Sequence, residues 1–140
     1  MTPKEYLSQI KYIDDLITSK LESIADLRAS VTNITSRLQD DRVQTSGKVD
    51  FTDTINKIVD MEREVNGYVD QLVDLKLNVE REINQLSDNM HVIILTNCYV
   101  LNKTLRDVAD DFYYSYSHIK TMHGQALVAF KKKFPEKFGR

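Results

Sequence analysis

The sequence is poor in the residues that interrupt helices: its 140 residues include only 4 Gly, 2 Pro and no Trp. Sandwiches, barrels and collagen-like chains need many turn-forming residues, so the composition argues against all three. A single Cys excludes an intramolecular disulfide framework and fits a reducing compartment. No apolar run is longer than five residues, and a membrane span needs about 20 residues. The N-terminus shows no secretory signal pattern, and no membrane association is expected.

Two heptad patterns occupy residues 1–86. In each, apolar residues recur at alternating steps of three and four, which is typical of the a and d positions of a coiled coil. A polar segment at about residues 40–50, containing Gly47, is the expected loop between them. The pattern therefore predicts a long antiparallel helical hairpin, with Thr2 capping its first helix and Asp50 or Thr52 its second. Gly67 is expected to mark a close approach of the two helices. The heptad residues are Tyr6, Ile10, Ile13, Ile17, Ile24, Leu27, Val31, Ile34 and Leu38, then Ile55, Ile58, Val65, Val69, Leu72, Val79, Ile83 and Leu86.

The hairpin has two interpretations. It is either a simple structural core or an arm that forms a dimer or binds another protein. The second is favoured because a two-helix hairpin buries only one face, so apolar residues off the heptad pattern need cover from elsewhere. Those residues are Leu7, Leu16, Leu21, Val59, Tyr68, Val73 and Leu77.

Shorter helices are predicted in residues 87–140. Side chains that favour helix N-caps, Ser87 or Asp88, then Thr104 and Ser115, divide this segment into three helices. The last helix is expected from about residue 116 to residue 132, before Pro135. A short break before a longer final helix is typical of a helix-turn-helix, so the predicted fold is all-α, a coiled-coil-like hairpin (1–86) followed by a three-helix helix-turn-helix domain (87–140). The expected inward residues are Ile94, Leu95, Cys98, Tyr99, Val108, Ala109, Phe112 and Ile119, and Tyr114 is expected to form a hydrophobic staple with Ile119.

Residues 88–133 resemble region 4 of the primary sigma factors, which binds the promoter −35 element. The matching positions are Tyr99, Thr104, Leu105, Asp107, Val108, Ala109, Phe112, Ser115, Ile119, Ala126 and Leu127. The whole chain more loosely resembles small phage-encoded transcriptional regulators of Gram-positive bacteria, the ArpU-like and RinA-like activators. The resemblance implies transcription regulation in the bacterial cytoplasm, with double-stranded DNA as a partner and RNA polymerase as a further one.

The expected DNA-binding residues surround the start of the last helix. The resemblance carries recognition contacts to Tyr116, Ser117, Lys120 and Thr121, and hydroxyl, ammonium and aromatic groups can reach base edges. Sigma factors usually place Arg and Glu where this chain has Tyr116 and Ser117, so their promoter consensus does not transfer. The complete expected set is Tyr116, Ser117, His118, Lys120, Thr121, Gln125, Thr104, Arg106, Lys131 and Lys132.

The charge is unevenly distributed. The net charge of −2 argues at first against a polyanion-binding protein. Residues 104–140, however, carry seven basic and four acidic residues, a net +3, which leaves −5 for residues 1–103. The basic end either lies against DNA phosphates or complements the macrodipole of the last helix. A DNA-binding segment with a net charge of only +3 is expected to bind DNA weakly as a single copy. This expectation supports a homodimer formed through the N-terminal helices.

No sequence pattern of catalysis is present. There is no Gly-rich phosphate loop, nucleophile elbow, HExxH motif or Cys/His metal spacing. We therefore expect a non-enzyme without metal or cofactor, and we expect Cys98 to be a buried structural thiol. The alternative to a DNA-binding regulator is a helical interaction module that inhibits RNA polymerase or another regulator and keeps a sigma-like fold without specific DNA binding.

Overall fold

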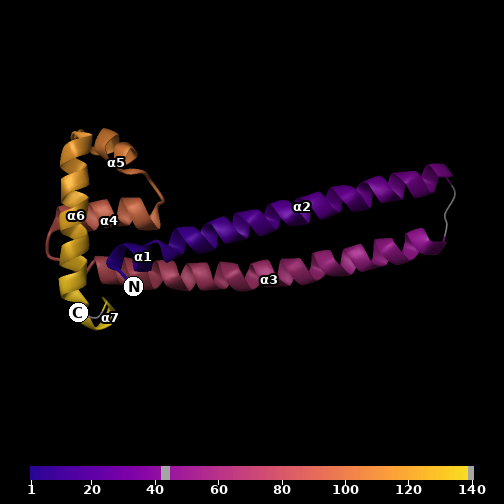
Figure 1. Cartoon of the computed structure of the whole chain (residues 1–140), viewed down its shortest axis with the longest axis horizontal. Coiled ribbons are helices and arrows are strands. Elements are labelled where there is room, and N and C mark those ends of the chain that lie inside the picture. The colour runs from indigo at the N-terminus through magenta and orange to yellow at the C-terminus, as the bar shows by residue number, and fades with distance from the viewer. Residues whose placement is uncertain (42–44, 139–140) are drawn as a thin grey trace. The chain divides into compact units, whose positions relative to one another are not determined.

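The computed structural model describes residues 1–41 and 45–138, with side chains for residues 1–33 and 51–138. All regular structure in these ranges is helical, which confirms the predicted all-α class. The elements are α1 (Pro3–Leu7), α2 (Gln9–Asp41), α3 (Thr45–Ile83), α4 (Asn89–Leu95), the π-helical turn η1 (Thr96–Val100), α5 (Leu105–Phe112), α6 (Tyr116–Lys133) and α7 (Pro135–Phe138) (Figure 1).

The N-terminal cap and the polar segment differ in how well they were predicted. The Thr2 hydroxyl accepts a hydrogen bond from the Glu5 amide at 3.1 Å, as the capping pattern predicts. The first helix is nevertheless divided at Ser8, which ends α1. The expected loop at residues 40–50 is also too long, because α2 continues to Asp41 and α3 begins at Thr45. Polar residues can continue a helix, and an interior Gly such as Gly47 costs only about 1 kcal/mol relative to Ala. The rest of the expected loop, residues 42–44, lies outside the described residues.

The chain forms two compact units. Unit 1 comprises Met1–Ile13 and Leu72–Arg140, and unit 2 comprises Asp14–Gln71. Unit 1 therefore includes N-terminal residues that the sequence analysis assigned to the helical arm, and the expected domain boundary at residues 86 and 87 lies within it.

Unit 1 is organised around α6. This helix packs against α1, α4, α5 and α7, and Figure 1 shows it crossing α4. A larger core cluster joins residues at both ends of the sequence, including the fully buried Leu7, Ile83 and Phe130. A smaller cluster of Ile94, Val108, Ala109 and Ile119 joins α4, α5 and α6. These two clusters fix the inner face of α6 and leave its opposite face in solvent.

A polar contact joins the N-terminal and C-terminal helices of unit 1. The Tyr6 hydroxyl donates a hydrogen bond to Glu82, and Lys137 forms an ion pair with the same carboxylate at 3.0 Å. The Lys137 ammonium also lies 5.2 Å from the centre of the Tyr6 ring. Burial is the main reason that the pKa of Tyr6 is raised, so its hydroxyl remains a donor.

Unit 2 consists of segments of α2 and α3. Heptad residues such as Ile17, Ile24, Ile58 and Val65 are buried, as the pattern predicts. Other heptad positions are open: Ile55 is 38% exposed and Val69 is 39% exposed. Ion pairs connect the two helices at Lys20–Glu64, with 2.9 Å between the charged atoms, and at Arg28–Glu62.

Gly67 in unit 2 does not mark a close helix contact. No heavy atom lies within 4 Å of the position that a Cβ would occupy there. The expectation of a close approach is therefore wrong, because the space beside Gly67 is open. Two residues off the heptad pattern remain accessible in the same unit, Leu21 at 51% and Val59 at 42%.

Candidate nucleic-acid interface

The start of α5 is fixed by a capping box. The Thr104 hydroxyl accepts a hydrogen bond from the Asp107 amide at 3.1 Å, and the Asp107 carboxylate accepts one from the Thr104 amide at 3.3 Å. Both groups satisfy amides that would otherwise lack a partner in the first turn. The carboxylate of Asp107 is thereby held at the start of α5. Arg106, the preceding residue, is exposed.

Only three residues separate the end of α5 from the start of α6. The Ser115 hydroxyl accepts a hydrogen bond from the His118 amide at 3.1 Å, which confirms Ser115 as the predicted cap. Ile119, Ala126 and Phe130 form the buried face of the helix. Because helical residues three or four apart share a face, this set places Ser117, Thr121 and neighbouring positions on the opposite, solvent-facing side.

All ten residues that the sequence analysis assigned to DNA binding are exposed. The structure brings Arg106 of α5 and Tyr116 of α6 together, with the guanidinium carbon 4.3 Å from the ring centre. Lys131 and Lys132 are far from this pair, because Lys131 lies fifteen residues beyond Tyr116, or roughly 22 Å along the helix. Thr104 serves as the helix cap, so its hydroxyl is already engaged.

The outward face of α6 is polar at its centre. Ser117, Thr121 and Gln125 are exposed there, and the Thr121 hydroxyl donates to the Ser117 carbonyl at 3.1 Å. Its oxygen lone pairs remain able to accept from a ligand. Gly124 lies on the same face, and no heavy atom lies within 4 Å of the position of an added Cβ. The backbone of α6 can therefore be approached closely at this point.

Two aromatic residues expected to pack inward are exposed. Phe112 is 37% exposed, because it lies in the last turn of α5, where the chain leaves the helix. Tyr114 is 43% exposed, and its ring lies over His118 at a centroid distance of 5.2 Å. The ring of Tyr114 thus contacts the imidazole of His118, which the expected staple with Ile119 did not include.

Tyr113 was not identified from the sequence as a site residue. It ends α5 in the left-handed conformation, with φ 61°, and its side chain is 94% exposed. Glycine is the usual residue in this conformation because it has no Cβ. A tyrosine at a helix end gives no sequence signal of a left-handed residue, so only the structure could reveal it.

The interface carries moderate positive charge. Lys131, Lys132 and Lys133 occupy the last turn of α6, and Lys120 lies one turn after the Ser115 cap. Lys103 is less available, because its ammonium is 3.0 Å from the Asp111 carboxylate. The free cations thus lie on α6 and on Arg106, on both sides of the turn between α5 and α6.

Comparison with protein-family models, with curated proteins and with solved structures finds no match to this chain. The interface is therefore interpreted from its own chemistry. No group of three or more His, Cys, Asp or Glu side chains in residues 1–33 and 51–138 is arranged to hold a metal ion. No helix in the described part of the chain has the length and apolar character needed to cross a membrane.

Cys98 does not supply a reactive thiolate to the candidate interface. It is half-buried on η1, and burial raises its pKa to about 11. The thiol rather than the thiolate is therefore the dominant form at neutral pH, and thiolate is the reactive form.

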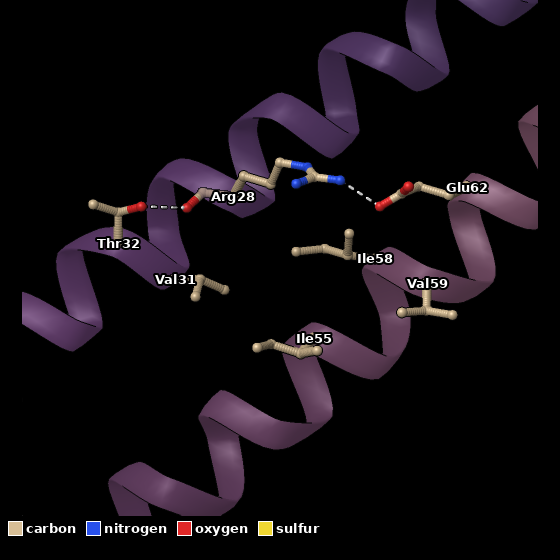
Figure 2. A pocket seen from close by; sticks show the side chains of 7 residues that line it. All are labelled: Arg28, Val31, Thr32, Ile55, Ile58, Val59 and Glu62. Carbon is tan, nitrogen blue, oxygen red and sulfur yellow. Dashed lines mark hydrogen bonds and ion pairs between the residues drawn. The ribbon is translucent and has the colours of Figure 1, made fainter.

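A second candidate site is an apolar groove within unit 2. The groove has a volume of about 490 Å³ and lies between α2 and α3 (Figure 2). Arg28 and Glu62 form an ion pair at one end of it, and the Thr32 hydroxyl donates to the Arg28 carbonyl at 3.0 Å. Its lining residues are Arg28, Val31, Thr32, Ile55, Ile58, Val59 and Glu62. The groove has the chemistry of a protein contact, since its floor is aliphatic and its charges lie at the rim.

Proposed function

We propose that the chain is a sequence-specific DNA-binding transcriptional regulator, of the kind represented by the phage-encoded regulators that it resembles. In this proposal α5 and α6 form a helix-turn-helix, and α6 enters the major groove of double-stranded DNA in a bacterial host cell. The supporting observation is the exposed polar face of α6, which begins at the Ser115 cap directly after α5. The proposal assigns no catalytic step to the chain.

The side chains on this face suit base-edge contacts. Lys120 can donate to guanine O6 and N7, and Gln125 can pair with adenine N6 and N7. The Thr121 hydroxyl uses its hydrogen to donate to the Ser117 carbonyl, so its oxygen lone pairs remain able to accept from a base. Gly124 lets a base pair or phosphate approach the helix backbone, since a Cβ there would meet open space. These four positions combine donors, acceptors and close approach on one side of α6.

Pairing of two chains is the second part of the proposal. Residues 104–140 carry a net charge of only +3, and binding to DNA at moderate salt relies on several phosphate contacts. Two copies would double these contacts. The groove of unit 2 offers a surface for self-association, because Ile55 and Val59 are 38% and 42% exposed beside it. We propose a homodimer that forms through this groove.

A helical interaction protein is the second candidate function. The groove also suits a segment of another protein, and residues 1–103 carry a net charge of −5, which does not favour DNA. An inhibitor of RNA polymerase or of another regulator would use such a surface. Salt separates the two functions, because phosphate contacts weaken steeply as salt rises whereas an apolar interface changes little.

DNA binding is tested by selecting duplexes from a random pool with the purified protein and measuring affinity for the selected site. A Lys120→Ala/Thr121→Ala variant should lose about tenfold or more in affinity for that site. Lys57→Ala, which removes an exposed lysine of unit 2, is the matched control. Failure to enrich any sequence, or undiminished binding by the double variant, would contradict the assigned DNA-binding face.

Self-association is tested by sedimentation equilibrium. Val59→Asp places a charge beside the groove and should shift the protein from dimer to monomer. Leu77→Asp changes a more accessible apolar residue of α3 in unit 1, at 56% exposure, and should leave the dimer intact. A monomeric wild type, or equal effects of both substitutions, would exclude dimerisation through the groove.

A further inference from the structure

The guanidinium of Arg106 lies over the ring of Tyr116, across the turn between α5 and α6. We propose that they act as one phosphate-binding unit, in which Tyr116 holds the guanidinium of Arg106 so that it donates two hydrogen bonds to a single DNA phosphate. This inference rests on the proposed function and assigns separate roles to two of its residues. Arg106 becomes a backbone contact, and Tyr116 becomes a positioning residue rather than one that contacts a base.

The geometry of the pair leaves the donors of Arg106 available. Its guanidinium carbon lies 4.3 Å from the centre of the Tyr116 ring, which is within the range of a cation–π contact. All five N–H bonds of a guanidinium lie in its plane, so a guanidinium that stacks on a ring by its face keeps its donor edge free, which is the arrangement that the proposal requires. A planar fork held in one orientation matches two oxygens of a phosphate.

The acidic neighbours of Arg106 do not occupy this donor edge. The Asp107 carboxylate accepts from the Thr104 amide in the capping box. Asp111 forms its ion pair with Lys103 at 3.0 Å, and no ion pair joins Arg106 to Asp110 one turn later in the described structure. Among the described residues, Arg106 therefore combines an exposed cation, an aromatic ring next to its guanidinium and no carboxylate partner.

Its place on the first helix of the candidate motif favours phosphate over base. In helix-turn-helix complexes the first helix crosses the backbone while the second lies in the major groove. Arg106 belongs to the first turn of α5, whereas the base-edge candidates Lys120 and Thr121 belong to α6. Phosphate contacts position a protein on DNA without reading its sequence. The pair is therefore expected to strengthen binding to all duplexes equally.

The role of Tyr116 as a support follows from its surroundings. Tyr116 is only 38% exposed, although it is the first residue of α6. The Ser115 hydroxyl accepts a hydrogen bond from the His118 amide, and this bond holds the backbone from which the Tyr116 side chain extends. The hydroxyl of Tyr116 has no assigned task in this arrangement, and its removal should leave affinity unchanged.

The test measures affinity of the full chain for the selected duplex and for a scrambled duplex over a series of salt concentrations. Arg106→Lys keeps the charge but loses the planar fork, so it should lower affinity by on the order of tenfold for both duplexes and leave the salt dependence unchanged. Tyr116→Phe should bind as the wild type does. Tyr116→Ala should lose about two- to fivefold, and this loss should vanish when Arg106 is already Ala.

Several results would overturn the inference. Equal losses for Tyr116→Phe and Tyr116→Ala would show that the hydroxyl contacts DNA directly. Additive losses in Arg106→Ala/Tyr116→Ala would show that the residues act independently, and a changed ratio between the two duplexes would assign Arg106 to base contact. Wild-type protein that binds neither duplex would instead reject the proposed function itself. Thermal melting of each variant checks the fold, which should persist because both side chains are exposed.

Discussion

The hydroxyl of Tyr99 lies 2.7 Å from Nε2 of His123, and the two rings are stacked with their centres 5.7 Å apart. This contact joins η1 to the inner side of α6. Burial lowers the pKa of His123, with Lys4 acting in the same direction, and burial raises the pKa of Tyr99 far above its ordinary value. The Tyr99 hydroxyl and Nε2 of His123 therefore share a hydrogen bond in a setting that favours the neutral form of both groups.

The stability of unit 1 should fall in mild acid. His123 has a lower pKa in the folded chain than the ordinary value of 6.5, so the unfolded chain binds more protons as the pH falls below that value. Its contribution to the free energy of unfolding is therefore complete above pH 6.5 and is lost as the pH falls through the folded-state pKa. Urea unfolding at pH 7.5 and at pH 5 measures the difference, which should shrink in His123→Gln.

His118→Gln is the matched control for this pH dependence. His118 is exposed on the same helix, so its replacement should leave the acid-induced loss of stability unchanged. An equal effect of both substitutions would show that the acid sensitivity does not arise at His123. Tyr99→Phe removes the hydrogen bond without adding a charge and should lower the free energy of unfolding by about 1 kcal/mol at pH 7.5.

The thiol of Cys98 should react slowly in the folded protein. With its pKa raised to about 11 by burial, roughly one molecule in a thousand carries the thiolate at pH 8. Labelling with a disulfide reagent should therefore be slow in buffer and become fast in urea. Rapid labelling in buffer that matches the rate in urea would contradict the half-buried position on η1.

The helix starts could be predicted because the bonds that form them are local. Asp88, Thr104 and Ser115 each accept from a backbone amide two or three residues later. Such a contact needs only the right side chain at a fixed spacing, so the sequence contains all the information. The exposure of the eight predicted interface residues that lie on α6 follows in the same way from the apolar face that Ile119 and Phe130 define.

Other features arise from packing between distant segments and have no local pattern. The π-helical turn at Thr96–Val100 places the buried Asn97 so that its side chain donates to the Ile93 carbonyl at 2.8 Å. The left-handed backbone of Tyr113 is another such feature. The pairing of Arg106 with Tyr116 depends on the angle between α5 and α6, which spacing within either helix does not specify.

The helical glycines Gly67 and Gly124 should respond alike in stability and differently in DNA binding. Gly67→Ala and Gly124→Ala each place a methyl group in open space. Each should raise the free energy of unfolding by up to about 1 kcal/mol, because Ala loses less backbone entropy in a helix. Only Gly124→Ala should weaken binding to the selected duplex, since Gly124 lies on the outward face of α6. Equal affinity of both variants would show that DNA does not approach the backbone at Gly124.

Tyr113 is expected to destabilise the fold that it belongs to. Its φ of 61° is unfavourable for a residue with a Cβ, and a side chain that is 94% exposed gains little from packing. Tyr113→Gly should therefore raise the free energy of unfolding by about 1 kcal/mol. Tyr113→Ala removes the ring but keeps the Cβ, so it should bring no such gain. Urea unfolding of the two variants separates these effects, and an equal change in both would assign the difference to the ring rather than to the left-handed backbone.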